Sequence, residues 1–222
     1  MSAGDVAEHK VRRVEVVHES LFVLVLDRNG LEFMPGDCVA LHTGTGQSRP
    51  YSIASGDGEG HLQFVIRKME EGEVSPWLMA RKPGDAVGVS APFGWFRPGQ
   101  EIGDSPFIFI ATGTGVAPFL SCSKSSGLKA PAGFLYGVRR EADAVGADHL
   151  ANWCDLQQAI SRERTENHHF GRLTDLLDTM PMMPETHYYL CGLESMISEV
   201  TAWLEGRGVN LSYIHREVFF HG

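Results

Sequence analysis

The stretch FIFIATGTGVAP, residues 107–118, decides the fold class of this 222-residue chain. The apolar run Phe107 to Ala111 predicts a buried strand, and Val116 to Ser126 predicts a helix after a glycine-rich turn. Glycines at a strand-to-helix turn let a diphosphate approach the backbone, where the helix dipole favours its charge. The spacing differs from the common Gly-x-Gly-x-x-Gly fingerprint, so a purely structural turn stays an alternative.

Strand-like and helix-length segments alternate after this stretch, which is typical of an α/β domain with a parallel sheet. Gly133 to Val138 and His187 to Cys191 predict further strands. Leu193 to Arg207 predicts a helix, because its apolar residues recur on one helical face.

The first hundred residues instead predict a small β-barrel of six short strands separated by turn sequences. One short helix is expected at Ser75 to Arg81. The polar, glycine-rich segment Pro98 to Asp104 marks a boundary, so we expect two domains, residues 1–100 and 104–222. The six strands are expected at Val11–Val17, Leu21–Leu26, Cys38–His42, Tyr51–Ala54, Leu62–Arg67 and Ala86–Val89.

The charge balance argues against several classes of partner. Nineteen basic and 28 acidic side chains leave a net charge of −9, which disfavours nucleic acid and anionic membrane surfaces. The apolar run Leu21 to Leu26 is far shorter than the roughly 20 residues that span a bilayer. Met1 to Arg13 lacks the apolar core of a signal peptide, so a cytoplasmic location is expected. The four cysteines and the pair His168-His169 lack the spacing of metal ligands, so we predict no metal site.

Arg49, Pro50, Tyr51 and Ser52 place a cation, a flat aromatic ring and a hydroxyl on consecutive residues of extended chain. A planar anionic ligand would use all three: the guanidinium for phosphate, the ring for stacking and the hydroxyl for a ring nitrogen. Taken alone, such a string is more often structural.

A second cluster, Gly72-Glu73-Val74-Ser75, follows a strand and opens the short helix. Its backbone N–H groups and the Ser75 hydroxyl suit a phosphate at a helix N-terminus. The alternative is that Ser75 caps the helix and Pro76 takes the first helical position. For this cluster alone, the capping role is favoured.

The order of these clusters resembles a known family. An Arg-x-Tyr-Ser strand, a Gly-x-x-Ser loop, a Thr-Gly-Thr-Gly-x-x-Pro turn and a Cys-Gly strand end are similar to the ferredoxin–NADP reductase family, bacterial type. The likeness extends from about Val11 to Phe220. It implies a six-stranded antiparallel Greek-key β-barrel that binds FAD, followed by an α/β domain with a parallel sheet that binds NADP.

In the barrel, the resemblance implies that Arg49 contacts flavin phosphate, Tyr51 stacks on the isoalloxazine and Ser52 hydrogen-bonds near N5. Thr114 matches a residue at the isoalloxazine edge. The other flavin-binding residues that it implies are Pro50, Val65, Ile66, Arg67, Glu73, Val74 and Ser75.

In the α/β domain, the resemblance implies that the turn faces the nucleotide diphosphate through Thr112, Gly113, Thr114, Gly115 and Pro118. Cys191 and Gly192 would lie beside the nicotinamide. Four residues match positions that hold the 2′-phosphate of NADPH or lie beside it: Arg139, Ser161, Arg162 and Arg172. A dianionic phosphate needs several donors, and Arg supplies a fork of them. For any single Arg, a solvated surface charge is the alternative.

The C-terminal segment resembles the closing strand of the family. By that resemblance Glu217 lies close to Ser52 and Phe219 covers the flavin, with Phe220 as the alternative aromatic. The implied catalytic residues are therefore Ser52, Cys191, Glu217 and Phe219.

The resemblance implies that the chain transfers hydride between NADPH and FAD, and single electrons between the flavin and ferredoxin or flavodoxin. Both halves of the chain are net acidic, which weakens the assignment of an acidic partner. One alternative is the NAD(P)H reductase component of an oxygenase. Another is a flavin- or nucleotide-binding regulatory module without turnover, because a fold alone does not fix a function.

Overall fold

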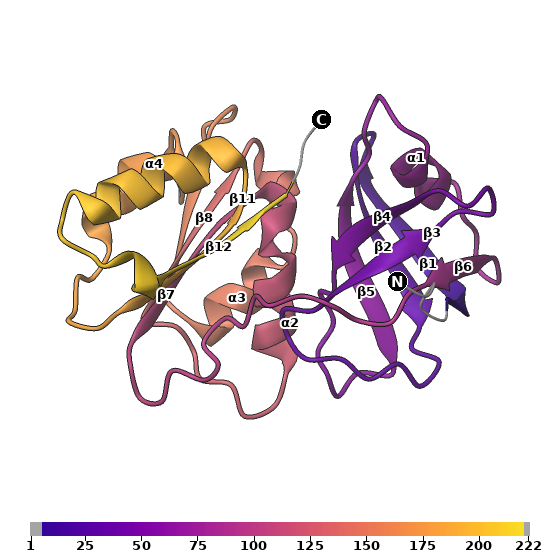
Figure 1. The fold of residues 1–222 in the computed structure, drawn as a ribbon. Helices are drawn as coiled ribbons and strands as arrows, with labels where there is room; N and C mark the ends of the chain where they lie inside the picture. The colour runs from indigo at the N-terminus through magenta and orange to yellow at the C-terminus, as the bar shows by residue number, and fades with distance from the viewer. Residues whose placement is uncertain (1–5, 220–222) are drawn as a thin grey trace. The chain divides into compact units, whose positions relative to one another are not determined.

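The computed structural model describes residues 6–219, and the chain divides into two compact units (Figure 1). One unit is Met1–Trp95 with Ala117–Ser126, and the other is Phe96–Val116 with Gly127–Gly222. The expected domain ranges, 1–100 and 104–222, differ from this division over residues 96–100 and 117–126. They stay a prediction of how the chain divides into independently folding parts.

The first unit is built on a six-stranded antiparallel sheet in the order β4-β3-β6-β1-β2-β5. β6 lies between β3 and β1, so neighbours in space are not neighbours in sequence. Just beyond β4, the amide of Ala54 donates to the carbonyl of Gln63 in β5 at 2.7 Å, which links the two end strands. The strands are β1 (Ala7–His18), β2 (Leu21–Asp27), β3 (Cys38–His42), β4 (Ser48–Ser52), β5 (His61–Arg67) and β6 (Ala86–Val89).

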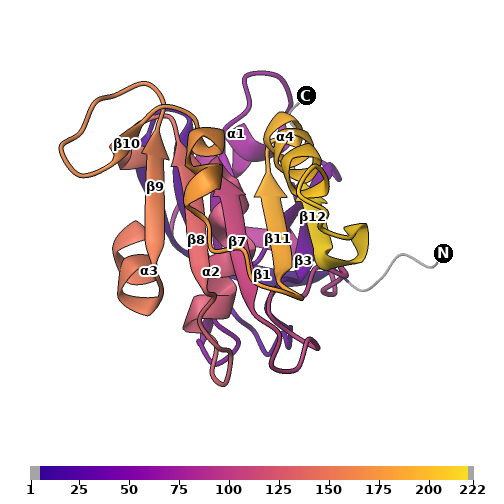
Figure 2. The same ribbon diagram turned by 90° about the vertical axis from the view of Figure 1, so that its left-hand side faces the viewer.

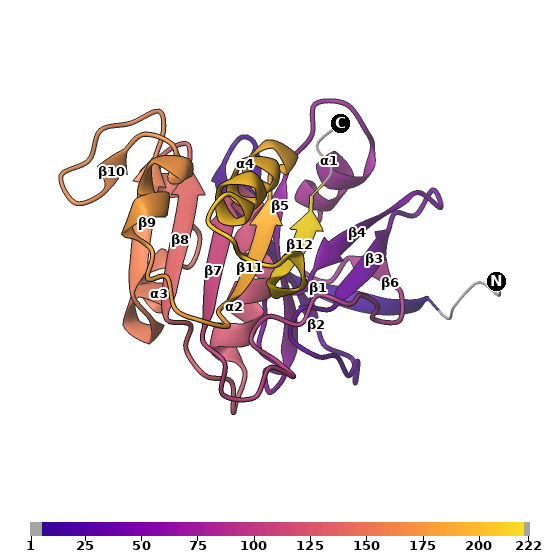
Figure 3. The same ribbon diagram turned by 60° about the vertical axis from the view of Figure 1, so that its left-hand side comes forward.

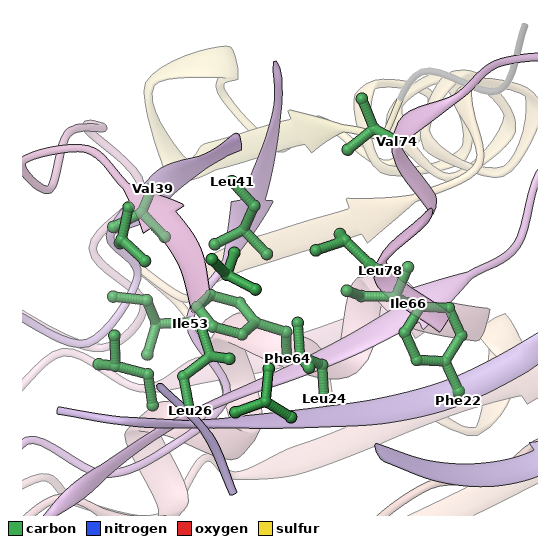
Figure 4. Close-up of a cluster of buried hydrophobic side chains, with 14 of the residues drawn as sticks. Phe22, Leu24, Leu26, Val39, Leu41, Ile53, Phe64, Ile66, Val74 and Leu78 are labelled. Carbon is green, nitrogen blue, oxygen red and sulfur yellow. The ribbon is translucent and has the colours of Figure 1, made fainter. Parts of the chain in front are cut away.

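The barrel interior is filled by alternate residues of these strands, as the two-residue period of a strand requires. Phe22, Leu24 and Leu26 of β2 pack there with Phe64 and other apolar residues (Figure 4). Helix α1 (Val74–Met79) adds Val74 and Leu78 to the same core. These buried aliphatic and aromatic side chains are the main stabilising contribution of the unit.

Helix α2 (Ala117–Lys124) belongs to the barrel unit although it follows the glycine-rich turn. The Ser121 hydroxyl donates to the carbonyl of Ser55 at 2.7 Å. Lys124 Nζ donates to the carbonyl of Ala54 at 3.3 Å and to Gln63 Oε1 at 3.1 Å. Burial is the largest cause that lowers the pKa of Lys124. The sequence pattern showed the helix but gave no sign of this attachment.

The second unit contains a six-stranded parallel sheet in the order β10-β9-β8-β7-β11-β12 (Figures 2 and 3). Its strands are β7 (Phe107–Thr112), β8 (Gly133–Val138), β9 (Leu156–Ile160), β10 (His169–Phe170), β11 (His187–Gly192) and β12 (Ile214–Val218). The parallel arrangement agrees with the expectation from the alternating segments.

Helical elements cover both faces of this sheet. α4 (Glu194–Glu205) and the 3₁₀ segment η3 (Leu173–Thr179) pack on the face that carries Ile108 and Ile110. On the other face, Trp153 of α3 (Ala147–Trp153) contacts Phe109, with ring centroids 6.2 Å apart. Successive residues of β7 therefore contribute to opposite layers, as its unbroken apolar run requires.

The elements expected from the sequence were mostly confirmed, with shifted ends. β4 ends at Ser52 rather than Ala54, because Ile53 bonds to Asp37 and Ala54 bonds to Gln63 instead of continuing the ladder. α1 begins at Val74, one residue earlier than expected. Among residues 6–219, no helix combines the length and apolar character needed to cross a membrane.

Candidate functional site

The strand order of the parallel sheet reverses direction between β7 and β11. The chain continues from β7 to β8 on one side, whereas β11 and β12 lie on the other. In open α/β sheets, ligands bind at the carboxyl ends of the strands at such a switch point. The glycine-rich turn η1 (Gly113–Val116) follows β7 at this point, and Gly192 ends β11.

The two strand ends pack so closely that only glycine fits at two positions. A Cβ on Gly115 would lie 2.6 Å from the carbonyl carbon of Cys191 and 2.7 Å from Gly192 Cα. A Cβ on Gly192 would lie 2.8 Å from the carbonyl oxygen of Thr112, and the φ of Gly192 is +135°. Both glycines are therefore required by the packing of one strand end against the other, and we call these two packed strand ends the glycine cradle.

Hydrogen bonds fix the cradle in place. The amide of Leu193 donates to Thr112 Oγ1 at 2.9 Å. The hydroxyl of Tyr136 donates to the carbonyl of Gly113 at 3.1 Å. The amide of Phe219 donates to the carbonyl of Gly192 at 3.0 Å, so the chain after β12 passes beside the end of β11.

The C-terminal candidates are placed by the register of β11 and β12. Cys191 pairs with Glu217, and Gly192 pairs with Val218. Cys191 is fully buried, whereas Glu217 and Phe219 are half-buried. The alternative aromatic, Phe220, lies outside the described residues.

The four residues predicted to hold the 2′-phosphate converge at the carboxyl ends of β8, β9 and β10. The amide of Arg162 donates to the carbonyl of Arg139 at 2.8 Å. The Ser161 hydroxyl donates to the carbonyl of Val138 at 3.3 Å. Arg172 follows Gly171 at the end of β10, and all four residues are exposed. The structure therefore brings these residues to one edge of the sheet.

Acidic groups accompany the basic groups at this edge, a feature that the sequence did not reveal. Arg172 Nη2 lies 2.9 Å from Glu199 Oε1 of α4. His169 Nε2 lies 3.1 Å from Asp175 Oδ2, and His168 Nε2 lies 3.5 Å from Glu141 Oε1. The hydrogen bonds from His169 and from the amide of Arg172 lower the pKa of Asp175.

In the barrel unit, the first candidate cluster lies on the end strand β4. Arg49 is exposed, Tyr51 is half-buried and Ser52 is buried. Burial raises the pKa of Tyr51 to about 12, although the charge of Arg49 opposes that shift. Tyr51 is therefore a neutral, flat ring beside a cation at physiological pH.

The Ser52 hydroxyl has a sulfur neighbour that the sequence did not predict. Ser52 Oγ lies 3.3 Å from Cys38 Sγ, and both side chains are buried. Cys38 and Ser52 are register partners in β3 and β4. Either group can donate in this contact, which holds Ser52 Oγ beside the sulfur of Cys38.

The candidates on β5 and α1 divide between the barrel core and the opposite face of β5. The side chains of Ile66 and Val74 belong to the barrel core, so only their backbone remains for a ligand. Val65 and Arg67 alternate with Ile66 and point to the opposite side of β5. Because Val65 is also buried, the backbone of these residues and the half-buried side chain of Arg67 are what this strand offers to a flavin.

The expected cap of α1 was wrong. Glu73 occupies the N-cap position, and Ser75 lies inside the first helical turn. The Ser75 hydroxyl instead accepts a hydrogen bond from the amide of Met69 at 2.9 Å and holds the preceding loop. Among residues 6–219, no group of three or more His, Cys, Asp and Glu residues has a metal-binding arrangement.

Both candidate sites fit the groups expected of them. The barrel offers an exposed guanidinium, a neutral half-buried ring and a buried hydroxyl on one short strand, which suit a flavin with its phosphates. The switch point offers a glycine cradle, and the adjoining sheet edge offers three arginines, which suit a phosphorylated dinucleotide.

Comparison with known proteins assigns both units. Residues 10–97 match the oxidoreductase FAD-binding domain family model, and residues 109–202 match the oxidoreductase NAD-binding domain model. A ferredoxin–NADP reductase B from Sorangium cellulosum is 31% identical over 190 residues, which cover 76% of this chain and 77% of that protein. This chain belongs to the ferredoxin–NADP reductase family. By family, its two matched segments are an oxidoreductase FAD-binding domain and an oxidoreductase NAD-binding domain.

Other family relatives have different partners in their names. The toluate 1,2-dioxygenase electron transfer component of Pseudomonas putida is 28% identical over 94% of this chain. The chain spans 65%, 62% and 66% of the lengths of three such dioxygenase components. A ferredoxin NADP+ reductase from Neisseria gonorrhoeae, solved with FAD and NADP, shares the fold with a TM-score of 0.83 at 20% identity, covering 97% of this chain and 99% of that one.

Proposed function

We propose that the chain is a ferredoxin–NADP(+) reductase that transfers hydride between NADPH and FAD, and single electrons between the flavin and a ferredoxin or flavodoxin. The observation that carries this proposal is the glycine cradle at the switch point, with Gly115 and Gly192 packed against neighbouring backbone. It occurs in a chain whose barrel presents Arg49, Tyr51 and Ser52 on one strand. When bound, FAD supplies the exchange between two-electron and one-electron chemistry.

In this proposal, the barrel binds and orients FAD. Arg49 binds phosphate, the neutral ring of Tyr51 stacks on the isoalloxazine, and the Ser52 hydroxyl donates or accepts near N5. Pro50 and the residues 65–67 and 73–75 contribute the surrounding surface. The contact between Ser52 Oγ and Cys38 Sγ at 3.3 Å supports a defined position of the hydroxyl oxygen.

The parallel-sheet unit binds NADPH in the same proposal. The turn residues Thr112 to Pro118 face the diphosphate, and Cys191 and Gly192 lie beside the nicotinamide. Arg139, Ser161, Arg162 and Arg172 hold the adenosine end with its 2′-phosphate. Support comes from the convergence of these four residues on one sheet edge.

The roles of the C-terminal residues and of Thr114 complete the proposal. Phe219 covers the flavin face and moves aside for the nicotinamide, and Glu217 lies close to Ser52. The hydrogen bond from Phe219 to Gly192 at 3.0 Å supports a place for Phe219 beside the nicotinamide-binding strand end. Thr114 meets the isoalloxazine edge.

A second candidate function is the reductase component of an oxygenase. The similarity to the toluate dioxygenase component over 94% of this chain favours it. The two functions differ in the protein that accepts the electrons. Reduction of a purified ferredoxin or flavodoxin, compared with reduction of a dioxygenase system, separates them. Absence of any NADPH oxidation with ferricyanide would instead support the regulatory module.

A cytoplasmic location is part of the proposal. Within residues 6–219, which include all four cysteines, there is no disulfide. Reduced thiols are what a reducing compartment maintains.

The coenzyme assignment is tested by replacing Arg162 with Ala. A guanidinium–phosphate contact contributes roughly 1.5–3 kcal/mol, so the KM for NADPH should rise about tenfold. The KM for NADH should hardly change, because NADH has no phosphate at that position. The measurement is kcat/KM for both coenzymes at fixed ionic strength.

Arg207→Ala is the matched control, because Arg207 Nη2 pairs with Asp178 Oδ1 at 2.6 Å, outside the proposed site. Equal losses for the two coenzymes, or a wild type that prefers NADH, would contradict the assignment.

A further inference from the structure

The geometry points to Glu199 as a specificity-determining residue that opposes the 2′-phosphate at Arg172 and so limits the preference for NADPH over NADH. This inference rests on the proposed function, because it takes the edge at β8, β9 and β10 as the 2′-phosphate site. It adds a residue of α4 that carries the opposite charge from the ligand-binding arginines.

The contact between Arg172 and Glu199 joins two different elements. Arg172 Nη2 donates to Glu199 Oε1 at 2.9 Å. Arg172 precedes η3, and its amide donates to Asp175 Oδ2 at 2.8 Å, so its backbone is held independently of its side chain. Glu199 is fixed by α4, whose apolar face packs on the sheet. A phosphate that approaches Arg172 therefore meets a carboxylate already bound to the guanidinium.

The arginines at this edge differ in their ion pairs. Within the described chain, residues 6–219, neither Arg139 nor Arg162 forms a salt bridge, whereas Arg172 does. Arg139 and Arg162 are thus available to an anion without loss of an existing pair. To bind a phosphate, the Arg172 guanidinium must leave Glu199 or contact both groups, which reduces the free energy that Arg172 contributes to phosphate binding.

The exchange is feasible because the pair is exposed. The side chains of Arg172 and Glu199 are 60% and 44% exposed. Exposed ion pairs stabilise the folded protein only weakly, and salt screens them. Glu199 therefore weakens phosphate binding by competing for Arg172 and by repelling a dianion, but it does not block the site.

The test uses Glu199→Gln in the FAD-loaded protein, which keeps the side-chain shape and removes the charge. The probes are adenosine 2′,5′-bisphosphate and adenosine 5′-monophosphate, with Kd measured by calorimetry at low and fixed ionic strength. We expect the bisphosphate to bind about two- to fivefold more tightly than in the wild type. The monophosphate should show no matching gain, and the difference should shrink at high salt.

Asp178→Asn is the matched control. It removes the charge of the carboxylate in another exposed salt bridge of the same unit. In that salt bridge, Arg207 Nη2 lies 2.6 Å from Asp178 Oδ1. It lowers the net negative charge by the same amount as Glu199→Gln. The control should leave the ratio of the two Kd values unchanged.

The possible outcomes are distinguishable. An unchanged ratio in Glu199→Gln, an equal gain for both probes, or the same gain in Asp178→Asn would overturn the role of Glu199 while leaving the phosphate site intact. A wild type that binds the two probes equally, or binds neither, would show that this edge is not a 2′-phosphate site. In that case the coenzyme part of the proposed function fails, and the inference fails with it.

Discussion

At the residue scale, the Ser52 hydroxyl is the group on which the proposed chemistry depends most. Ser52→Ala should leave FAD bound and slow its reduction by NADPH about tenfold, because one hydrogen bond near the reacting atom is lost. Stopped-flow absorbance under anaerobic conditions measures this rate. Cys38→Ala should slow reduction less, since it leaves the hydroxyl present but without the contact at 3.3 Å. An unchanged rate in Ser52→Ala would remove Ser52 from the catalytic residues.

Tyr51 gives a pH-dependent prediction at the same scale. Burial raises its pKa to about 12, whereas an unfolded tyrosine titrates near 10. Above pH 10 the unfolded chain has lost a proton that the folded chain retains, so the free energy of unfolding should fall as pH rises toward 12. Urea unfolding at pH 9, 10 and 11 measures this slope. Tyr51→Phe should reduce it, and an identical slope in wild type and variant would contradict the buried position.

Contacts of single residues were the part of the site least visible in the sequence. Arg49, Tyr51 and Ser52 were expected to share one extended segment, and the structure places all three in β4, whereas their role at a flavin stays a prediction. The contact between Ser52 and Cys38 depends on the register of two strands, and the pair Arg172 and Glu199 joins residues 27 positions apart. Local sequence patterns do not predict contacts between residues that are far apart in the sequence.

At the element scale, the close approach of the turn after β7 to the end of β11 gives a sharp prediction. In Gly115→Ala, the new methyl would lie 2.6 Å from the carbonyl carbon of Cys191, so one of the two strand ends must move. We expect a loss of about 1–3 kcal/mol of stability together with weaker nucleotide binding. Thermal unfolding and nucleotide titration measure both.

Gly133→Ala is the matched control for that substitution. Gly133 lies in the same sheet, and its nearest neighbour would be Pro181 Cδ at 3.8 Å, an ordinary contact distance. The control should change stability little or raise it by about 0.4–1 kcal/mol. Equal behaviour of the two variants would mean that the packing at Gly115 is not required.

Elements with a strong pattern were predicted, and weak ones were missed. β7 and β8 are unbroken apolar runs, and α4 has a clear apolar face. β9 was missed because LQQAI carries polar residues at half-buried positions. β10 has only two residues, which is too short for a pattern to show, and α3 places only Ala147 and Leu150 in the interior.

At the scale of the whole molecule, the sequence predicted both architectures because each has a characteristic pattern of turn residues and of apolar periodicity. Short strands between glycine and proline turns indicated the barrel, and alternating strands and helices indicated the parallel sheet. The attachment of α2 to the barrel through Ser121 and Lys124 was not predicted. The expected approach of Glu217 to Ser52 stays a prediction.

We propose above all that this chain holds FAD and that NADPH reduces it. The most direct measurement is the visible absorption spectrum of the purified, FAD-loaded protein during an anaerobic titration with NADPH. We predict the spectrum of a bound oxidised flavin that bleaches with stoichiometric NADPH, and FAD as the flavin released on denaturation. A protein that retains no FAD, or a bound FAD whose spectrum NADPH leaves unchanged, would contradict the account.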